Sequence, residues 1–163
     1  MASGAGSWSF TEEDFGAITG SLQKFLGNSN ARCALLVDRA GQLVATVGEK
    51  PNFDPTAFAT LTAADFSAND QLAKLIGEHD FNSLFHQGET ASMYLADVAH
   101  RVILVVLFDN RTTLGLVRLK MKETVAELTK LFEHVFSRGT VGGPAAQPGV
   151  LAGADDEIDK LFQ

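Results

Sequence analysis

The chain has 163 residues, of which 45% are hydrophobic and 20% charged, a composition typical of a globular domain that excludes a wholly disordered protein. Its formal net charge of −7 excludes the broad positive surface that nucleic-acid binding requires. The longest apolar run, residues 102–108, is too short to span a bilayer, so we expect no membrane insertion.

The start of the chain and its cysteine usage both bear on location. Residues 1–10 lack the basic and apolar regions of a signal peptide, and we expect them to form a mobile leader. The single cysteine, Cys33, cannot form an internal disulfide and lies in an apolar run, which favours a small buried side chain over a nucleophile. A reducing, cytoplasmic location fits both observations.

Residues 11–27 predict the first helix. Apolar residues recur there at helical spacing, Thr11 is suited to cap the start, and acidic residues fill the first turn, where they favour the helix dipole. Gly27 and Asn28 are expected to end the helix. Two β-rich runs, residues 32–38 and 42–48, follow with a short glycine-containing turn between them, which indicates a β-hairpin.

A second helix is predicted over residues 55 to about 77, because Asp54 and Pro55 are typical of a helix start. On a helical projection its larger apolar residues gather on one side, which we expect to face the sheet: Phe58, Leu61, Leu72 and Ile76. About a quarter turn away runs a nearly flat strip made of Thr60, Ala64, Ser67, Ala68 and Gln71. Such a strip would let another helix or protein approach closely, and a plain exposed helix surface is the alternative.

Three strands are predicted at residues 81–88, 91–99 and 101–108. The turns between them are too short for helical crossovers, so these strands should form an antiparallel meander. The last of them is apolar throughout residues 102–108, which is typical of a strand in the middle of a sheet that is covered on both faces.

A third helix is predicted from near Thr113 to residue 136, and residues 137–139 are expected to end it. Residues 139–154 are a Gly/Pro/Ala linker. Residues 155–163 are an acidic amphipathic tail, suited to fold on a partner, with a frayed terminus as the alternative. The order αββαβββα predicts one α+β domain over residues 11–138, with a five-stranded antiparallel sheet and helices on both faces.

The motifs that carry chemistry are missing. The four histidines fall in four different predicted elements, and we expect each to be an ordinary surface or loop side chain: His79, His86, His100 and His134. The chain contains no HExxH or CxxC spacing for a metal, and neither a GxxxxGK[ST] loop nor a GxGxxG loop for a nucleotide. We therefore expect no cofactor, no metal and no catalytic residue, and a protein that is not itself an enzyme.

Two arginines, Arg111 and Arg118, flank the start of the third helix, where positive charge is unfavourable. One interpretation is a site for an anion or an acidic partner at the helix N-terminus. The other is structural: Asp109 and the acidic residues of the first helix offset the charge.

Three blocks, LLVDRAGQLVATVG, LTAADFSANDQLAKLIGE and FDNRTTLGLVRL, occur in an order that resembles the roadblock / dynein-light-chain family over about residues 10–137. Within that family the chain is similar to bacterial regulators of cell polarity and gliding motility. The resemblance implies a homodimer with paired sheets, in which the second helices form a platform for a Ras-like small GTPase of the MglA type. It implies stimulation of GTP hydrolysis by remodelling of the GTPase's switch regions, without an arginine finger from this chain, in a protein that is concentrated at a cell pole.

Carried onto this chain, the resemblance adds the tail as a second GTPase contact. The expected partner-binding residues are Thr60, Ala64, Ser67, Ala68 and Gln71 on the second helix, and Ile158, Leu161 and Phe162 in the tail. Small residues found in this helix elsewhere in the family are partly replaced here by Asp65, Phe66 and Gln71. Two alternatives stay open: a roadblock-type scaffold that binds a GTPase without activating it, and a small-ligand sensory domain, which would need an internal pocket.

Overall fold

The computed structural model describes the backbone of residues 9–141 and the side chains of residues 9–138. Within this range the predicted order αββαβββα is confirmed. The elements are α1 (Glu12–Ser29), β1 (Cys33–Asp38), β2 (Leu43–Gly48), α2 (Pro55–Leu75), β3 (Ser83–Gln87), β4 (Ser92–Val98), β5 (Val102–Phe108) and α3 (Leu114–Val141).

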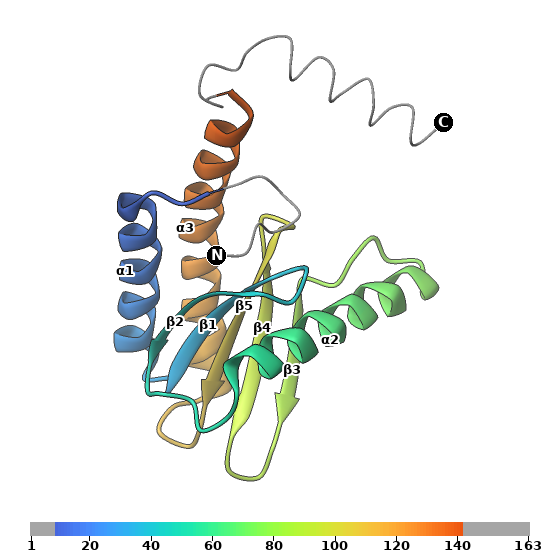
Figure 1. Ribbon diagram of the computed structural model, residues 1–163. Helices are drawn as coiled ribbons and strands as arrows, with labels where there is room; N and C mark the ends of the chain where they lie inside the picture. The colour runs from blue at the N-terminus through green and yellow to red at the C-terminus, as the bar shows by residue number, and fades with distance from the viewer. Residues whose placement is uncertain (1–8, 142–163) are drawn as a thin grey trace.

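The five strands form one antiparallel sheet in the order β2-β1-β5-β4-β3. α1 and α3 lie side by side on one face of this sheet, and α2 crosses the other face alone (Figure 1). The strand β5 is central and almost wholly buried, so the prediction for residues 102–108 is confirmed. Its neighbour β1 is buried at every position. One apolar core separates the sheet from α1 and α3, and a smaller one lies under α2.

α1 begins with a capping box. The Thr11 side chain accepts a hydrogen bond from the backbone of Asp14, and the Asp14 carboxylate accepts one from the backbone of Thr11. The helix continues to Ser29, through the predicted stop at Gly27 and Asn28. Asn30 ends it instead, in the left-handed conformation at φ 59°, with its backbone N–H bonded to the Leu26 carbonyl.

α3 begins where the sequence predicts, with the Thr113 hydroxyl accepting a hydrogen bond from the Leu116 N–H at 3.2 Å. The expected end at residues 137–139 is wrong, because the helix runs to Val141. Its last turns are held onto α1 by the ion pair between Arg138 and Asp14. At the same end Phe10, just before α1, packs edge-on against Phe132 with ring centroids 5.7 Å apart.

The β4–β5 turn places two residues other than glycine in the left-handed region, Ala99 at φ 54° and His100 at φ 57°. It is closed by a hydrogen bond of 3.1 Å from the Arg101 N–H to the Val98 carbonyl, as in a type I′ turn. Asn-Gly is the preferred pair in such a turn, since side chains with a Cβ lose about 1 kcal/mol there.

The combined change Ala99→Asn and His100→Gly should therefore stabilise the domain, raising the melting temperature by about 2–4 °C. Thermal unfolding followed by circular dichroism measures this. Gly77→Ala is the matched control and should lower the melting temperature. Gly77 has φ +84°, so an alanine there is strained by its backbone conformation alone, because its Cβ would meet nothing within 4 Å. A lower melting temperature for the turn variant would contradict the assignment of strain to the backbone.

The Asp14–Arg138 pair predicts a dependence of stability on pH. Asp14 is 10% exposed, and its hydrogen bonds from Arg138 hold the pKa of its carboxyl well below the ordinary 3.8. A carboxyl whose pKa is lowered by folding stabilises the fold above its unfolded pKa, and this stabilisation is lost as the pH falls.

Asp14→Asn should lower the melting temperature at neutral pH, and its difference from the natural chain should shrink between about pH 5 and pH 2. Glu133→Gln serves as the control, because Glu133 is exposed and has no ion-pair partner among the described residues. A difference for Asp14→Asn that stays constant over this pH range would overturn the linkage.

Candidate partner-binding surface

α2 packs on the sheet mainly through small side chains. The buried residues of this helix are Ala59, Thr62, Ala63, Phe66, Asn69 and Ala73. Close packing is also visible at Gly41 in the β1–β2 turn, where a Cβ would lie 3.2 Å from the Cα of Thr60. Phe66 is the one large anchor, with no exposed surface. The helix therefore lies close to the sheet, with little room for larger side chains beneath it.

The predicted orientation of α2 is wrong. Leu61, Leu72 and Ile76, which were expected to face the sheet, are 70%, 58% and 70% exposed. Phe58 alone of that group is half-buried, and its ring packs against Phe53 with centroids 4.6 Å apart. The helical projection took large apolar residues as the buried ones, whereas the close approach to the sheet selects alanines.

The flat strip predicted on α2 is exposed as expected: Thr60, Ala64, Ser67, Ala68 and Gln71 all face away from the sheet. At 100° per residue they share this side with Leu61, Leu72 and the 81% exposed Leu75. We call these eight residues the α2 outer face. Leucines exposed to this degree on one helix surface are characteristic of a site for protein association.

An open sheet edge lies beside the α2 outer face. Within the described residues β3 pairs only with β4, so its other edge leaves backbone N–H and C=O groups unpaired. His86 on β3 reaches Asp65 on α2, with 2.6 Å between Nε2 and Oδ2. The expected ordinary surface histidine thus has a carboxylate partner, which ties the edge strand to the helix.

A cluster of charged residues around Arg39 holds α2 against the sheet. The Arg39 guanidinium pairs with Asp70 of α2 at 2.7 Å and with Asp97 of β4. It also lies over the ring of Phe66, 4.9 Å from the centroid. The β1–β2 turn is thereby joined to α2 and to β4. No motif in the sequence indicates this cluster, because its members are far apart along the chain.

Arg111 is fully engaged within the domain. Its Nε lies 3.0 Å from Asp109 and its Nη1 lies 3.1 Å from Glu49, which also pairs with Arg32 at 2.9 Å. Hydrogen bonds from Arg32 and Arg111 lower the pKa of the Glu49 carboxyl. Asp109 offsets the charge of Arg111, as the structural interpretation predicts. The second carboxylate that does so is Glu49, and not an acidic residue of α1.

Arg118 lies with its guanidinium carbon 5.9 Å from the ring centroid of Tyr94 on β4. Arg118 is exposed, and among the described residues it forms no ion pair, whereas the Arg111 guanidinium is held by Asp109 and Glu49. Arg111 lies in the loop that leads into α3, and Arg118 lies in the first turns of α3, the helix that covers the opposite face of the sheet from α2 (Figure 1).

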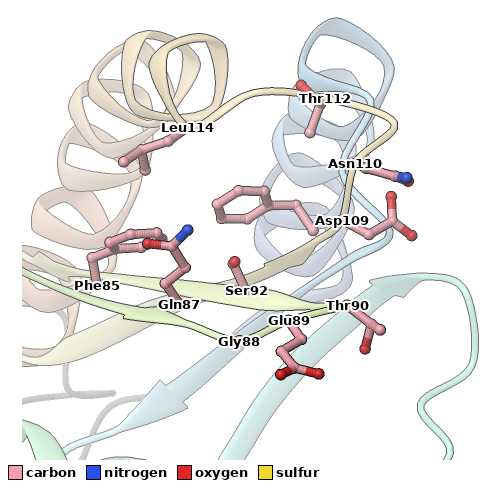
Figure 2. A pocket seen from close by; sticks show the side chains of 11 residues that line it. Phe85, Gln87, Gly88, Glu89, Thr90, Ser92, Asp109, Asn110, Thr112 and Leu114 are labelled. Atoms are coloured by element: carbon pink, nitrogen blue, oxygen red, sulfur yellow. The ribbon is translucent and has the colours of Figure 1, made fainter.

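A hollow of about 460 Å³ lies at the same end of the sheet, between the β3–β4 turn and the loop that leads into α3 (Figure 2). Phe85, Phe108 and Leu114 form its apolar side, while Gln87 and Glu89 belong to the exposed strand end and turn. It opens at the surface, at the margin of the core beneath α1 and α3, to which Phe108 belongs. This differs from the internal pocket that a small-ligand sensory domain requires.

The described residues contain no group of three potential metal ligands. Cys33 is buried, and burial raises the pKa of its thiol, which disfavours a nucleophilic thiolate. His100 lies 3.3 Å from Asp97, and this pair, like that of His86, is a contact with a carboxylate rather than with a nucleophile. None of the described helices is long and apolar enough to cross a membrane.

Of the expected partner-binding residues, the five on α2 lie together on its outer face. Ile158, Leu161 and Phe162 lie outside the described residues, as do the tail and most of the linker that precedes it. The exposed leucines of α2 were not among the expected partner-binding residues. The signal for them was present in the sequence as large apolar residues on a helix whose other side is rich in alanine.

Comparison with known proteins places this arrangement in a family. The Roadblock/LC7 domain family matches residues 21–108. Myxococcus xanthus MglB is 47% identical, over 72% of this chain and 95% of its own, with a TM-score of 0.69. The gliding protein MglB of Thermus thermophilus is 31% identical, over 79% of this chain and 98% of its own, with a TM-score of 0.73.

A further MglB structure, with a tetrameric arrangement, is 31% identical, over 80% of this chain and 98% of its own, with a TM-score of 0.74. A comparison with curated protein sequences gives no match. The family match spans more than half of the chain, and the fold and the MglB likenesses agree with it. The chain belongs to the Roadblock/LC7 domain family.

Proposed function

We propose that this protein is a regulator of a Ras-like small GTPase of the MglA type, which it binds and whose GTP hydrolysis it stimulates. The observation that carries the proposal is the α2 outer face, an exposed apolar helix surface beside an open sheet edge. The likeness to MglB of Myxococcus xanthus and of Thermus thermophilus supports a role in gliding motility and cell polarity. A cytoplasmic protein that gathers at a cell pole fits this role.

The surface suits a homodimer as well as a GTPase. The leucines of α2 are exposed to an extent that a soluble monomer rarely tolerates on one face. Pairing of two β3 edges around a twofold axis would satisfy their free backbone groups and bring the two α2 helices together. The small residues Ala64, Ser67 and Ala68 would then lie on a shared platform where a GTPase can approach closely.

Activation in this proposal uses no arginine from this chain. Arg111 lies in the loop before α3, where Asp109 and Glu49 hold its guanidinium. The catalytic arginine and glutamine would instead be those of the GTPase, positioned when its switch regions are remodelled on the α2 platform.

A scaffold that binds the GTPase without changing its rate of hydrolysis is the second candidate, because Roadblock/LC7 membership and the α2 outer face fit it equally well. Single-turnover GTP hydrolysis with and without a saturating amount of this protein separates the two. Unchanged hydrolysis with full binding would favour the scaffold and remove the activating role.

Ala64→Arg and Ala68→Arg should each abolish GTPase binding, since a long charged side chain on a close-packed surface introduces a clash and an unpaired charge. Affinity for the GTPase loaded with a GTP analogue is the measurement. Ala126→Arg is the matched control, because Ala126 is also exposed on a helix but lies on α3, across the sheet. Equal affinities for all three variants would place the GTPase site elsewhere.

Arg111→Ala should leave the maximal rate of stimulated hydrolysis within a few-fold of the natural protein, because the Arg111 guanidinium is held by Asp109 and Glu49 of its own domain. An arginine finger, by contrast, contributes about a thousandfold or more to turnover. The rate is measured at a saturating concentration of each variant, so that a change in affinity does not enter. A loss on the thousandfold scale would reinstate Arg111 as a catalytic group.

A further inference from the structure

A groove runs between α1 and α3 on the side of the molecule opposite α2. The two helices are antiparallel, as the contacts of Asp14 with Arg138 and of Asn30 with the Arg111 carbonyl at their two ends require. The groove is a hollow of about 480 Å³ with Ala17, Gly20 and Leu131 among its lining residues. A Cβ built on Gly20 meets nothing within 4 Å, so the space above this glycine is open.

The rim of this groove carries positive charge that is only partly compensated. Lys24 pairs with Glu127 at 3.0 Å, and Glu127 also accepts a hydrogen bond of 2.8 Å from Ser21. Both oxygens of Glu127 are thus engaged, and its hydrogen bonds from Ser21 and Lys24 lower the pKa of its carboxyl. Lys130 also lines the groove, and no described acidic side chain forms an ion pair with it.

The chain itself contains a segment whose chemistry matches this groove. Residues 155–163 read DDEIDKLFQ, with four acidic residues and one lysine. On a helix, Ile158, Leu161 and Phe162 would share one side, since they are spaced i, i+3 and i+4. An isolated helix of this length is marginal in water, so the segment needs a surface on which to fold.

The distance along the chain favours this groove over the far end of α3. Residues 142–154 join Val141 to the acidic segment, and a Gly-rich chain of that length has a root-mean-square span of about 20 Å. Lys130 lies 11 residues before the end of α3, which corresponds to about 17 Å of helix. Leu119, the other exposed apolar residue of interest on α3, lies about 33 Å from that end.

We propose that residues 155–163 dock in cis in the α1/α3 groove, with Ile158, Leu161 and Phe162 over Ala17, Gly20 and Leu131 and the acidic side chains beside Lys130. Tethering by a short linker raises the effective concentration of the segment to the millimolar range, so weak intrinsic affinity suffices. The docked segment hides its own apolar side chains and is released by any partner that binds them more tightly. The docking does not depend on the GTPase role proposed above.

The test uses the full chain with a nitroxide spin label at Gln163→Cys, because Cys33 is only 3% exposed and stays unlabelled. In ¹⁵N spectra, the amide signals of Gly20, Ser21 and Leu131 should lose most of their intensity and regain it when the label is reduced. Labelled ¹⁴N protein mixed with unlabelled ¹⁵N protein shows whether the effect arises within one chain. The proposal would be overturned if the signals lost were those of α2, or if no signals were lost. It would also be overturned if the loss arose only between chains.

A pair of matched variants tests the groove itself. Gly20→Phe fills the hollow, whereas Gly27→Phe adds the same side chain two turns along the same face of α1, outside the lining residues. A Cβ at either glycine meets nothing within 4 Å, so both variants should fold. The relaxation effect on Ser21 and Leu131 should disappear in Gly20→Phe and persist in Gly27→Phe. An effect that survives Gly20→Phe unchanged would show that the segment does not occupy the groove.

Discussion

The requirement to cover β1 and β5 on both faces governs the whole architecture. These two central strands are buried almost without interruption, so neither face of the sheet can be left to solvent. α1 and α3 together cover one face, and α2 alone covers the other (Figure 1). A single helix can do this only by lying close and crossing the strands, which explains the alanines beneath α2 and the tight contact between Gly41 and Thr60.

The ion pairs of the domain reinforce this three-layer arrangement at its ends. The Asp14–Arg138 pair closes α1 against α3, and the Glu49–Arg111 pair joins the end of β2 to the loop before α3. Arg39 performs the same task for α2. These groups act between elements distant in sequence, and all of them are at least partly screened by solvent, so hydrophobic burial remains the main stabilising term.

The order of elements, the antiparallel meander and the central position of residues 102–108 could be predicted, because each depends on local periodicity and turn length. The orientation of α2 could not, since it depends on how closely the helix approaches the sheet, and Leu61 and Leu72 are large residues that face outward. The strip from Thr60 to Gln71 could be predicted because it contains no large apolar residue and its centre, Ala64, Ser67 and Ala68, is small. The partners of Arg39 and Glu49 arise only when the chain is folded, and no spacing rule indicates them.

In α2 the large apolar residues face outward and the small ones face the sheet, which is the reverse of the orientation predicted for this helix. Its inner side, built on Phe66 and alanines, serves the core of the protomer, while Leu61, Leu72 and Leu75 add nothing to that core. Substitutions on the outer side should therefore be close to neutral for folding of the single chain. A chain built in this way can change one exposed helix surface by mutation, while a different set of residues maintains the fold.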